Sequence, residues 1–220
     1  GTVYSYVSMT EEIARDAQFS VANWLIEECG AAIGEAEAQA IVTGDGVSKP
    51  SGMLHVQPEP AADGSRTAMA LQYTASGAAD DLGSDPFVAI LSMMYSLKAG
   101  YRRNAAFAMN SETAGELRKI KDSDGRFLWQ EPVQAGQPPL LLGHPVVLAE
   151  QVPSIGTDAH PILFGDFGRA YALTTHGPFS ITAEDRSITE PGVDKIYLRA
   201  RVGGVVVDEN AVRVFKCAAS

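Results

Sequence analysis

The longest regular pattern of apolar residues in the chain covers residues 21–42. Apolar positions follow mostly four-residue steps, at Val21, Leu25, Cys29, Ala32, Ala36 and Ala40, and are widened by Trp24, Ile33 and Ile41. This spacing is typical of a helix with one buried face, and a helix of this length would be roughly 33 Å long. We expect one continuous helix that follows Ser20, whose hydroxyl can cap the first turn, and that buries Leu25, Cys29 and Ile33.

Two glycines interrupt this pattern, and a glycine-flanked turn ends it. Gly30 and Gly34 lie four residues apart, and each costs about 1 kcal/mol relative to alanine inside a helix. Two interpretations stay open: the helix tolerates the glycines, or a strand or a neighbouring chain approaches it closely there. The following Thr43-Gly44-Asp45-Gly46 indicates a helix stop and a turn.

The segments around the long helix give weaker patterns. Residues 1–8 alternate weakly and predict a strand, and residues 10–17 predict a short helix that leads into the long one. Residues 56–83 are rich in small and polar residues and are expected to be mostly loop, with one strand at 68–74.

Two further helices are predicted in the middle of the chain. Asp85 before Pro86 marks the start of one of them, with an inward face formed by Phe87, Ile90, Leu91, Met94, Tyr95 and Leu97. Ser111 is expected to cap the other, which ends near Ile120. A short buried strand at residues 105–109 separates the two.

The second half of the chain is rich in strand patterns. Strand or extended segments are expected at residues 126–130, 140–142, 146–149, 162–164, 170–175, 179–183, 196–202, 205–207 and 212–215. Residues 180–186 and 195–201 alternate polar and apolar side chains, which is typical of paired strands with one wet face. Helices early and strands late predict an α+β fold.

Composition narrows the function classes. With 220 residues, 45% hydrophobic and 20% charged, the chain can fold into one large or two small domains. A net charge of −10 argues against a nucleic-acid-binding surface, which needs clustered Lys and Arg. Cys29 and Cys217 form no disulfide framework. No apolar run approaches the ~20 residues that cross a membrane, and we predict a soluble protein.

Motifs for catalysis or cofactor binding are not found. Gly44 to Lys49 lacks the phosphate-loop spacing and follows a helix instead of preceding one, so we interpret it as a turn. Asp122-Ser123-Asp124-Gly125 lacks the later ligands of a calcium loop. The four histidines (His55, His144, His160 and His176) show no metal-ligand spacing. We therefore predict no catalytic, cofactor-binding or metal residues and no enzyme activity.

The helix that runs into TGDG and then Lys-Pro-x-Gly (Lys49 to Gly52) resembles the major capsid proteins of tailed phages with the HK97-type fold. The resemblance continues in the same order over residues 6–215. It is carried by Tyr101-Arg102-Arg103-Asn104, Met109-Asn110, Lys121-Asp122-Ser123-Asp124-Gly125-Arg126, Leu142-Gly143-His144-Pro145-Val146-Val147 and Phe164-Gly165-Asp166-Phe167. No single motif is decisive, but their ordered combination is specific.

The resemblance implies a structural protein that closes, in many copies, into an icosahedral shell around a phage or prophage genome. It implies a peripheral domain at residues 1–41 and 168–203, with the long helix as its spine, and an axial domain at 42–167 and 204–220. The N-terminal arm and extended loop of the family have no counterpart here, so we expect this chain alone to be monomeric or weakly oligomeric at micromolar concentration.

The partners that the resemblance implies are further copies, as pentamers and hexamers, and a scaffold, portal or maturation protease. Neither sequence-specific nucleic acid nor a membrane is among them. The location implied is the virion, and the host cytoplasm during assembly. As candidate subunit contacts we name Arg102, Arg103, Asp122, Asp124, Arg126, Glu184, Asp185, Arg186 and Glu190.

Two other function classes remain open. A cellular nanocompartment of the encapsulin kind shares this fold and would hold an enzyme instead of a genome. A small enzyme would need His144 or His176 beside carboxylates in one pocket.

Overall fold

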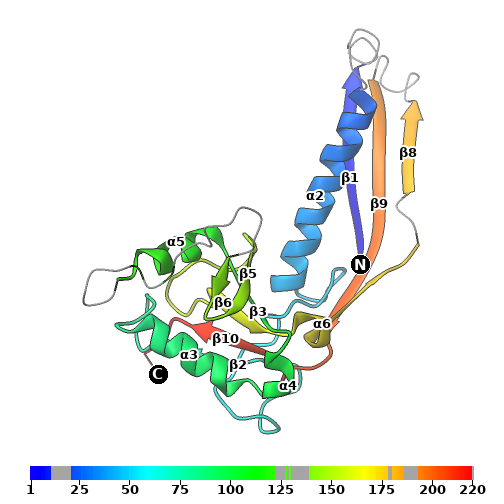
Figure 1. The fold of residues 1–220 in the computed structure, drawn as a ribbon. Coiled ribbons are helices and arrows are strands. Elements are labelled where there is room, and N and C mark those ends of the chain that lie inside the picture. Colours follow the sequence, from blue (N-terminus) through cyan, green and yellow to red (C-terminus); the bar gives the residue numbers. More distant parts are fainter. Residues whose placement is uncertain are drawn as a thin grey trace. The chain divides into compact units, whose positions relative to one another are not determined.

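The computed structural model describes residues 1–10, 21–121, 127, 129, 139–177, 180–185 and 193–219. The chain divides into two compact units (Figure 1). Unit 1 comprises residues 1–55 and 173–205, and unit 2 comprises residues 56–172 and 206–220.

Unit 1 contains a long helix and an antiparallel sheet. The helix is α2 (Val21–Thr43), and the strands are β1 (Thr2–Thr10), β7 (Tyr171–Thr175), β8 (Ser180–Asp185) and β9 (Val193–Val206). The sheet order is β1-β9-β7, and β8 also pairs with β9. The predicted pairing of residues 180–186 with 195–201 is confirmed, since Thr182 lies opposite Tyr197 in an antiparallel register.

One face of this sheet packs against α2. Val21, Leu25, Cys29 and Ile33 of the helix form a core with Leu198 of β9, and Val3 and Val7 of β1 pack against it. The prediction of one continuous helix that buries Leu25, Cys29 and Ile33 is therefore confirmed. The predicted cap Ser20 lies outside the described residues.

The helix ends where the sequence predicts. The N–H of Gly44 donates to the carbonyl of Ala40 at 2.9 Å, and a Cβ at Gly44 would collide with the carbonyl oxygens of Ala40 and Pro50. Gly46 has a φ of 72°, which glycine adopts without strain. Gly30 and Gly34 are exposed, and apart from the adjacent residues and the backbone of α2 itself, no atom of the described chain lies within 4 Å of a Cβ built on either. No described strand of this chain therefore explains these two glycines.

Unit 2 is built on a six-stranded mixed sheet. Its order is β2 (Gln72–Ala75), β10 (Val212–Lys216), β6 (Ile162–Gly165), β3 (Ala106–Met109), β5 (His144–Leu148) and β4 (Leu140–Leu141). The β10–β2 and β3–β5 pairs are parallel, and the other neighbours are antiparallel. In the part of unit 2 that the structure describes, four helices accompany the sheet: α3 (Pro86–Ser96), α4 (Ala99–Arg102), α5 (Ser111–Lys119) and α6 (Phe167–Ala170).

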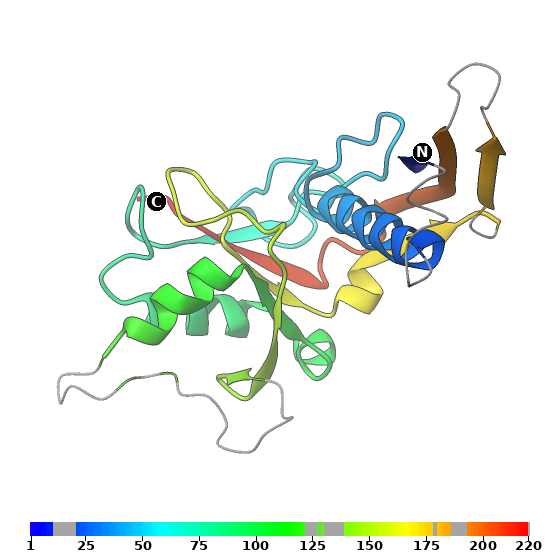
Figure 2. The same cartoon turned by 90° about the horizontal axis from the view of Figure 1, so that it is seen from above.

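The main core lies between this sheet and helices α3 and α5, which lie on the same side of β10 (Figure 2). Phe107, Phe164 and Phe215 from three strands meet Ile90 of α3 and Leu117 of α5, and all five are fully buried. The rings of Phe107 and Phe164 have centroids 4.4 Å apart. The alternation of strand side chains thus directs one aromatic row towards the helices.

An ion network joins the loop before β2 to β10. The Asp63 carboxylate lies 2.9 Å from the guanidinium of Arg213, 3.1 Å from that of Arg66 and 3.1 Å from the ammonium of Lys98. Arg213 is only 1% exposed. These three cations hold the pKa of Asp63 below its usual value, although its partial burial acts in the opposite direction.

Several predictions about local structure are wrong. Thr10 ends strand β1 instead of starting a helix, and the rest of that predicted helix lies outside the described residues. The strand expected at 68–74 begins only at Gln72. Helix α6 was not predicted, and the two strands expected at 196–202 and 205–207 form one strand, β9.

Two predictions about the helices of unit 2 also need correction. Asn110, not Ser111, caps α5: its side-chain oxygen accepts from the N–H of Thr113 at 2.8 Å, while the Ser111 hydroxyl donates to Glu150. Leu91 and Tyr95 of α3 are exposed, because the buried face of that helix is formed by Ile90, Met93, Met94 and Leu97.

Candidate interaction surfaces

Helix α3 is apolar on two faces. Ile90, Met93 and Leu97 are at most 1% exposed against the core of unit 2. On the outer side Val88, Leu91 and Tyr95 are 63%, 40% and 62% exposed. Their spacing of three and four residues places them in one stripe along the helix. We call these three residues the α3 stripe.

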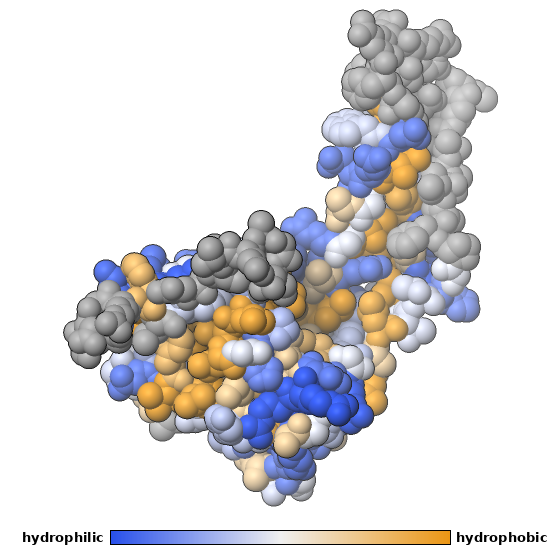
Figure 3. Space-filling model, viewed as in Figure 1, coloured by the Kyte–Doolittle hydropathy of each residue, from blue (hydrophilic) through white to orange (hydrophobic). Residues whose placement is uncertain are grey.

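The C-terminal end of the stripe is basic. The guanidinium carbon of Arg102, in α4, lies 4.6 Å from the centroid of the Tyr95 ring, within the range of a cation–π contact. The neighbouring Arg103 is exposed. Figure 3 shows apolar residues over α3 beside strongly hydrophilic residues over α4.

Near the N-terminal end of α3 lies an acidic groove. Its volume is about 440 Å³, and its lining includes the apolar residues Leu82, Pro86, Ile120 and Ile155 and the carboxylates of Asp81, Glu112 and Glu116. Lys119 is bound to Glu116, with 2.5 Å between Nζ and Oε1. An apolar floor with a negative rim suits an apolar segment that carries positive charge.

On the side of the unit 1 sheet opposite α2, the described side chains include exposed tyrosines. The register places Tyr4 opposite Arg199 and Tyr6 opposite Tyr197. The rings of Tyr6 and Tyr197 stack with centroids 5.8 Å apart, and Tyr4 and Tyr6 are 70% and 59% exposed. This face is therefore aromatic and basic, in contrast to the glutamate-rich outer side of α2.

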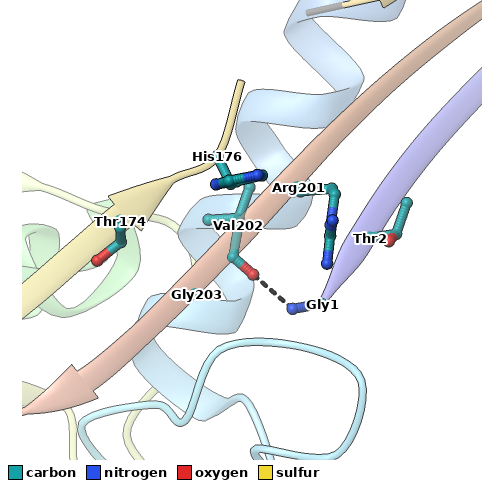
Figure 4. A pocket seen from close by; sticks show the side chains of 7 residues that line it. All are labelled: Gly1, Thr2, Thr174, His176, Arg201, Val202 and Gly203. Carbon is teal, nitrogen blue, oxygen red and sulfur yellow. Dashed lines mark hydrogen bonds between the residues drawn. The ribbon is translucent and has the colours of Figure 1, made fainter. Parts of the chain in front are cut away.

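A pocket of about 300 Å³ lies at the start of β1 (Figure 4). It is lined by Gly1, Thr2, Thr174, His176, Arg201, Val202 and Gly203. The amino group of Gly1 donates to the carbonyl of Val202 at 2.6 Å. The described lining residues include no carboxylate that could form an acid–base pair with His176.

The other histidine proposed for an enzyme, His144, is part of the core packing. Its ring lies edge-on to Phe107 and Phe164, with centroids 6.4 and 5.1 Å away, and its Nδ1 is 3.2 Å from the carbonyl oxygen of Ala105. His160 is also buried, which lowers its pKa. These environments favour structural roles for both side chains.

The structure describes only some of the candidate contact residues that were named from the sequence. Arg102 and Arg103 lie together at the end of the α3 stripe. Glu184 and Asp185 belong to β8, where only the backbone is described. Asp122, Asp124, Arg126, Arg186 and Glu190 lie outside the described residues.

The α3 stripe and the acidic groove were not recognised in the sequence. The sequence gives one signal for the stripe, since Val88 is an apolar position that the predicted inward face does not use, but Leu91 and Tyr95 were assigned to the inward face. The groove could not, because it combines α5 with residues 81–86 and with Ile155, which are distant in sequence.

Within the ranges that the structure describes, no three His, Cys, Asp or Glu side chains are grouped as a metal site would require. No described helix combines the length and the low polarity that crossing a membrane requires.

The family model described as "Phage capsid family" matches residues 1–217. No curated protein matches. Among solved structures, the "Capsid of native GTA particle computed with C5 symmetry" is 37% identical, with a TM-score of 0.85, over 99% of this chain and 72% of that chain.

More distant structures share the fold. The matched chain of Gordonia phage Cozz is 19% identical, with a TM-score of 0.62, over 100% of this chain and 70% of that chain. The holo-SrpI encapsulin complex of Synechococcus elongatus is 11% identical, with a TM-score of 0.64, over 100% of this chain and 75% of that chain. Both likenesses show the HK97-type fold alone.

Proposed function

This chain belongs to the phage capsid family and is a structural capsid protein that assembles with its own copies, and we propose that its two compact units divide this task. The observation that carries the function is the match to the GTA capsid at 37% identity, which covers 99% of this chain. The protein has the HK97-type fold and is a major capsid protein of an icosahedral particle that encloses a genome.

In the proposed division, unit 1 acts as the peripheral domain and unit 2 as the axial domain. The long helix α2 is then the spine, and unit 2 gathers around the five- and six-fold centres. Support comes from the separate cores of the two units and from the two surfaces on unit 2, the α3 stripe and the acidic groove. The sequence-based boundaries, 1–41 with 168–203 and 42–167 with 204–220, remain a proposal.

The proposed partners beyond its own copies are a scaffold, a portal or a maturation protease, met in the host cytoplasm during assembly. The protein would act without catalysing a reaction. It would hold DNA without reading its sequence, and a net charge of −10 supports this, because tight phosphate binding requires clustered cations.

Electron microscopy of the protein expressed alone tests the function. Pentamers, hexamers or closed particles of the full-length protein are expected. Particles purified from the natural source should contain DNA; protein cargo without DNA would favour the nanocompartment alternative. If the full-length protein formed neither rings nor particles, this result would contradict the proposed role of the two units.

A further inference from the structure

The α3 stripe is more apolar than is usual for a helix surface that stays exposed to solvent. A helix that is hydrophobic on opposite sides is normally covered on both. The core of unit 2 covers one side through Ile90 and Met93, but Val88, Leu91 and Tyr95 remain exposed. An exposed apolar stripe with charged residues at its end is typical of an interaction site.

The charges at the two ends of α3 differ in sign. Arg102 and Arg103 lie at the C-terminal end, beside Tyr95. Five exposed carboxylates lie at or near the N-terminal end, in and around the acidic groove: Asp80, Asp81, Asp85, Glu112 and Glu116. The stripe and the groove are therefore complementary in charge, and each offers apolar surface to the other.

We propose that the α3 stripe and Arg102–Arg103 of one copy dock into the acidic groove of the next copy, a contact that rests on the proposed shell function. A contact between two different surfaces of the same unit is head-to-tail and can repeat around an axis until a ring closes. A two-fold contact between antiparallel α3 helices would also bring opposite charges together, but it closes at two copies and cannot repeat around an axis. Copies that each carry a net charge of −10 repel one another at long range. A contact between oppositely charged surfaces opposes this repulsion.

Disulfide trapping between two variants tests this arrangement directly. Arg103→Cys and Glu112→Cys each place one exposed thiol, since the native Cys29 and Cys217 are buried. The two variants of the chain, distinguished by isotope labelling, are mixed at high concentration under oxidising conditions, and the products are resolved by mass spectrometry. The mixed Arg103→Cys/Glu112→Cys product should exceed each homotypic product by about tenfold.

A matched control replaces the groove variant by Gln57→Cys, an exposed position outside both surfaces. This variant should give no excess of mixed product with Arg103→Cys. Equal yields in all mixtures, a predominance of homotypic product, or no cross-linked product at all would each overturn the head-to-tail contact.

Reversing the charges on the two surfaces is a second test of the proposed contact. Arg102→Glu with Arg103→Glu, and separately Glu112→Lys with Glu116→Lys, should each weaken self-association by about tenfold in sedimentation experiments. Mixing the two variants should restore association, because each then meets an opposite charge. Circular dichroism and thermal melting of each variant verify folding, and unchanged association of both variants alone would overturn the proposal.

The failure of this contact is distinguishable from the failure of the proposed function. Particles that assemble in the electron microscope while both charge-reversed variants behave like the unaltered chain would leave the shell function intact and remove this interface. Rings held by the trapped disulfide, with no closed particle from the full-length protein, would support the interface and contradict the proposed function.

Discussion

Helices α2 and α3 each pack one face against a β-sheet, but their opposite faces differ in composition. The exposed residues of α2 are mainly glycines, alanines and the glutamates Glu27, Glu28 and Glu35, with Trp24 as one large apolar side chain that is 50% exposed. The outer side of α3 carries three large apolar side chains in one stripe, Val88, Leu91 and Tyr95. The outer side of α2 is therefore the more polar of the two, and that of α3 is the better candidate for contact with a partner.

The cores behind these helices also differ in size. Five buried residues form the cluster of unit 1, and sixteen form the main cluster of unit 2, counted over the described residues. Unit 2 also contains the ion network around Arg213. Since hydrophobic stabilisation grows with the area buried, unit 2 should be the more stable of the two.

The largest expected effect is the loss of an aromatic side chain from the core of unit 2. Phe107→Ala removes a fully buried ring that contacts Phe164 and should lower the free energy of unfolding by about 3–5 kcal/mol. Chemical denaturation followed by hydrogen exchange of the amides in unit 2 measures this loss. The control Val147→Ala, at a side chain that is 52% exposed, should change it by less than about 0.5 kcal/mol.

The next largest effect is the loss of stability when the ion network around Asp63 is broken, and this loss depends on pH. Asp63→Asn leaves the buried Arg213 without its carboxylate and should destabilise unit 2 by about 3 kcal/mol. The folded-state pKa of Asp63 is lowered, so its contribution is present above the unfolded value of about 4 and is lost as the pH falls through the folded value. The free energy of unfolding, measured by chemical denaturation at several acidic pH values, should depend more steeply on pH for the unaltered chain than for Asp63→Asn. Identical profiles would contradict this account.

The difference between the two helices also decides how far the sequence could be interpreted. In α2 the apolar positions recur regularly on one face of the helix. The burial of Leu25, Cys29 and Ile33 on that face was therefore predictable. In α3 both faces are apolar, and periodicity alone could not separate Ile90 and Met93 from Leu91 and Tyr95. The acidic groove depends on the long-range placement of Ile155 beside α5, which no local pattern encodes.

In unit 1 the corresponding core mutation should cost less. Leu25→Ala should lower the free energy of unfolding of this unit by about 2–3 kcal/mol, because a thin core can relax around the missing atoms. Hydrogen exchange of the α2 amides is the suitable measurement, with the exposed Glu28→Ala on the same helix as control. A loss larger than that of Phe107→Ala would show that the relative stabilities of the two units are the reverse of those argued here.

The smallest effect concerns the two glycines of α2. Gly30→Ala places a Cβ where, apart from the adjacent residues and the backbone of α2 itself, no atom of the described chain lies within 4 Å, so the chain alone should gain up to about 1 kcal/mol of stability. Thermal melting measures this gain, and Gly44→Ala serves as the opposite control, because its Cβ would collide with the carbonyls of Ala40 and Pro50. The same variant also separates the two interpretations of these glycines. If the helix merely tolerates Gly30, the alanine variant should assemble into particles as the unaltered protein does. If a neighbouring chain packs against the helix at this point, the variant should be more stable alone but should assemble less well, since the added methyl group then occupies the space of the partner.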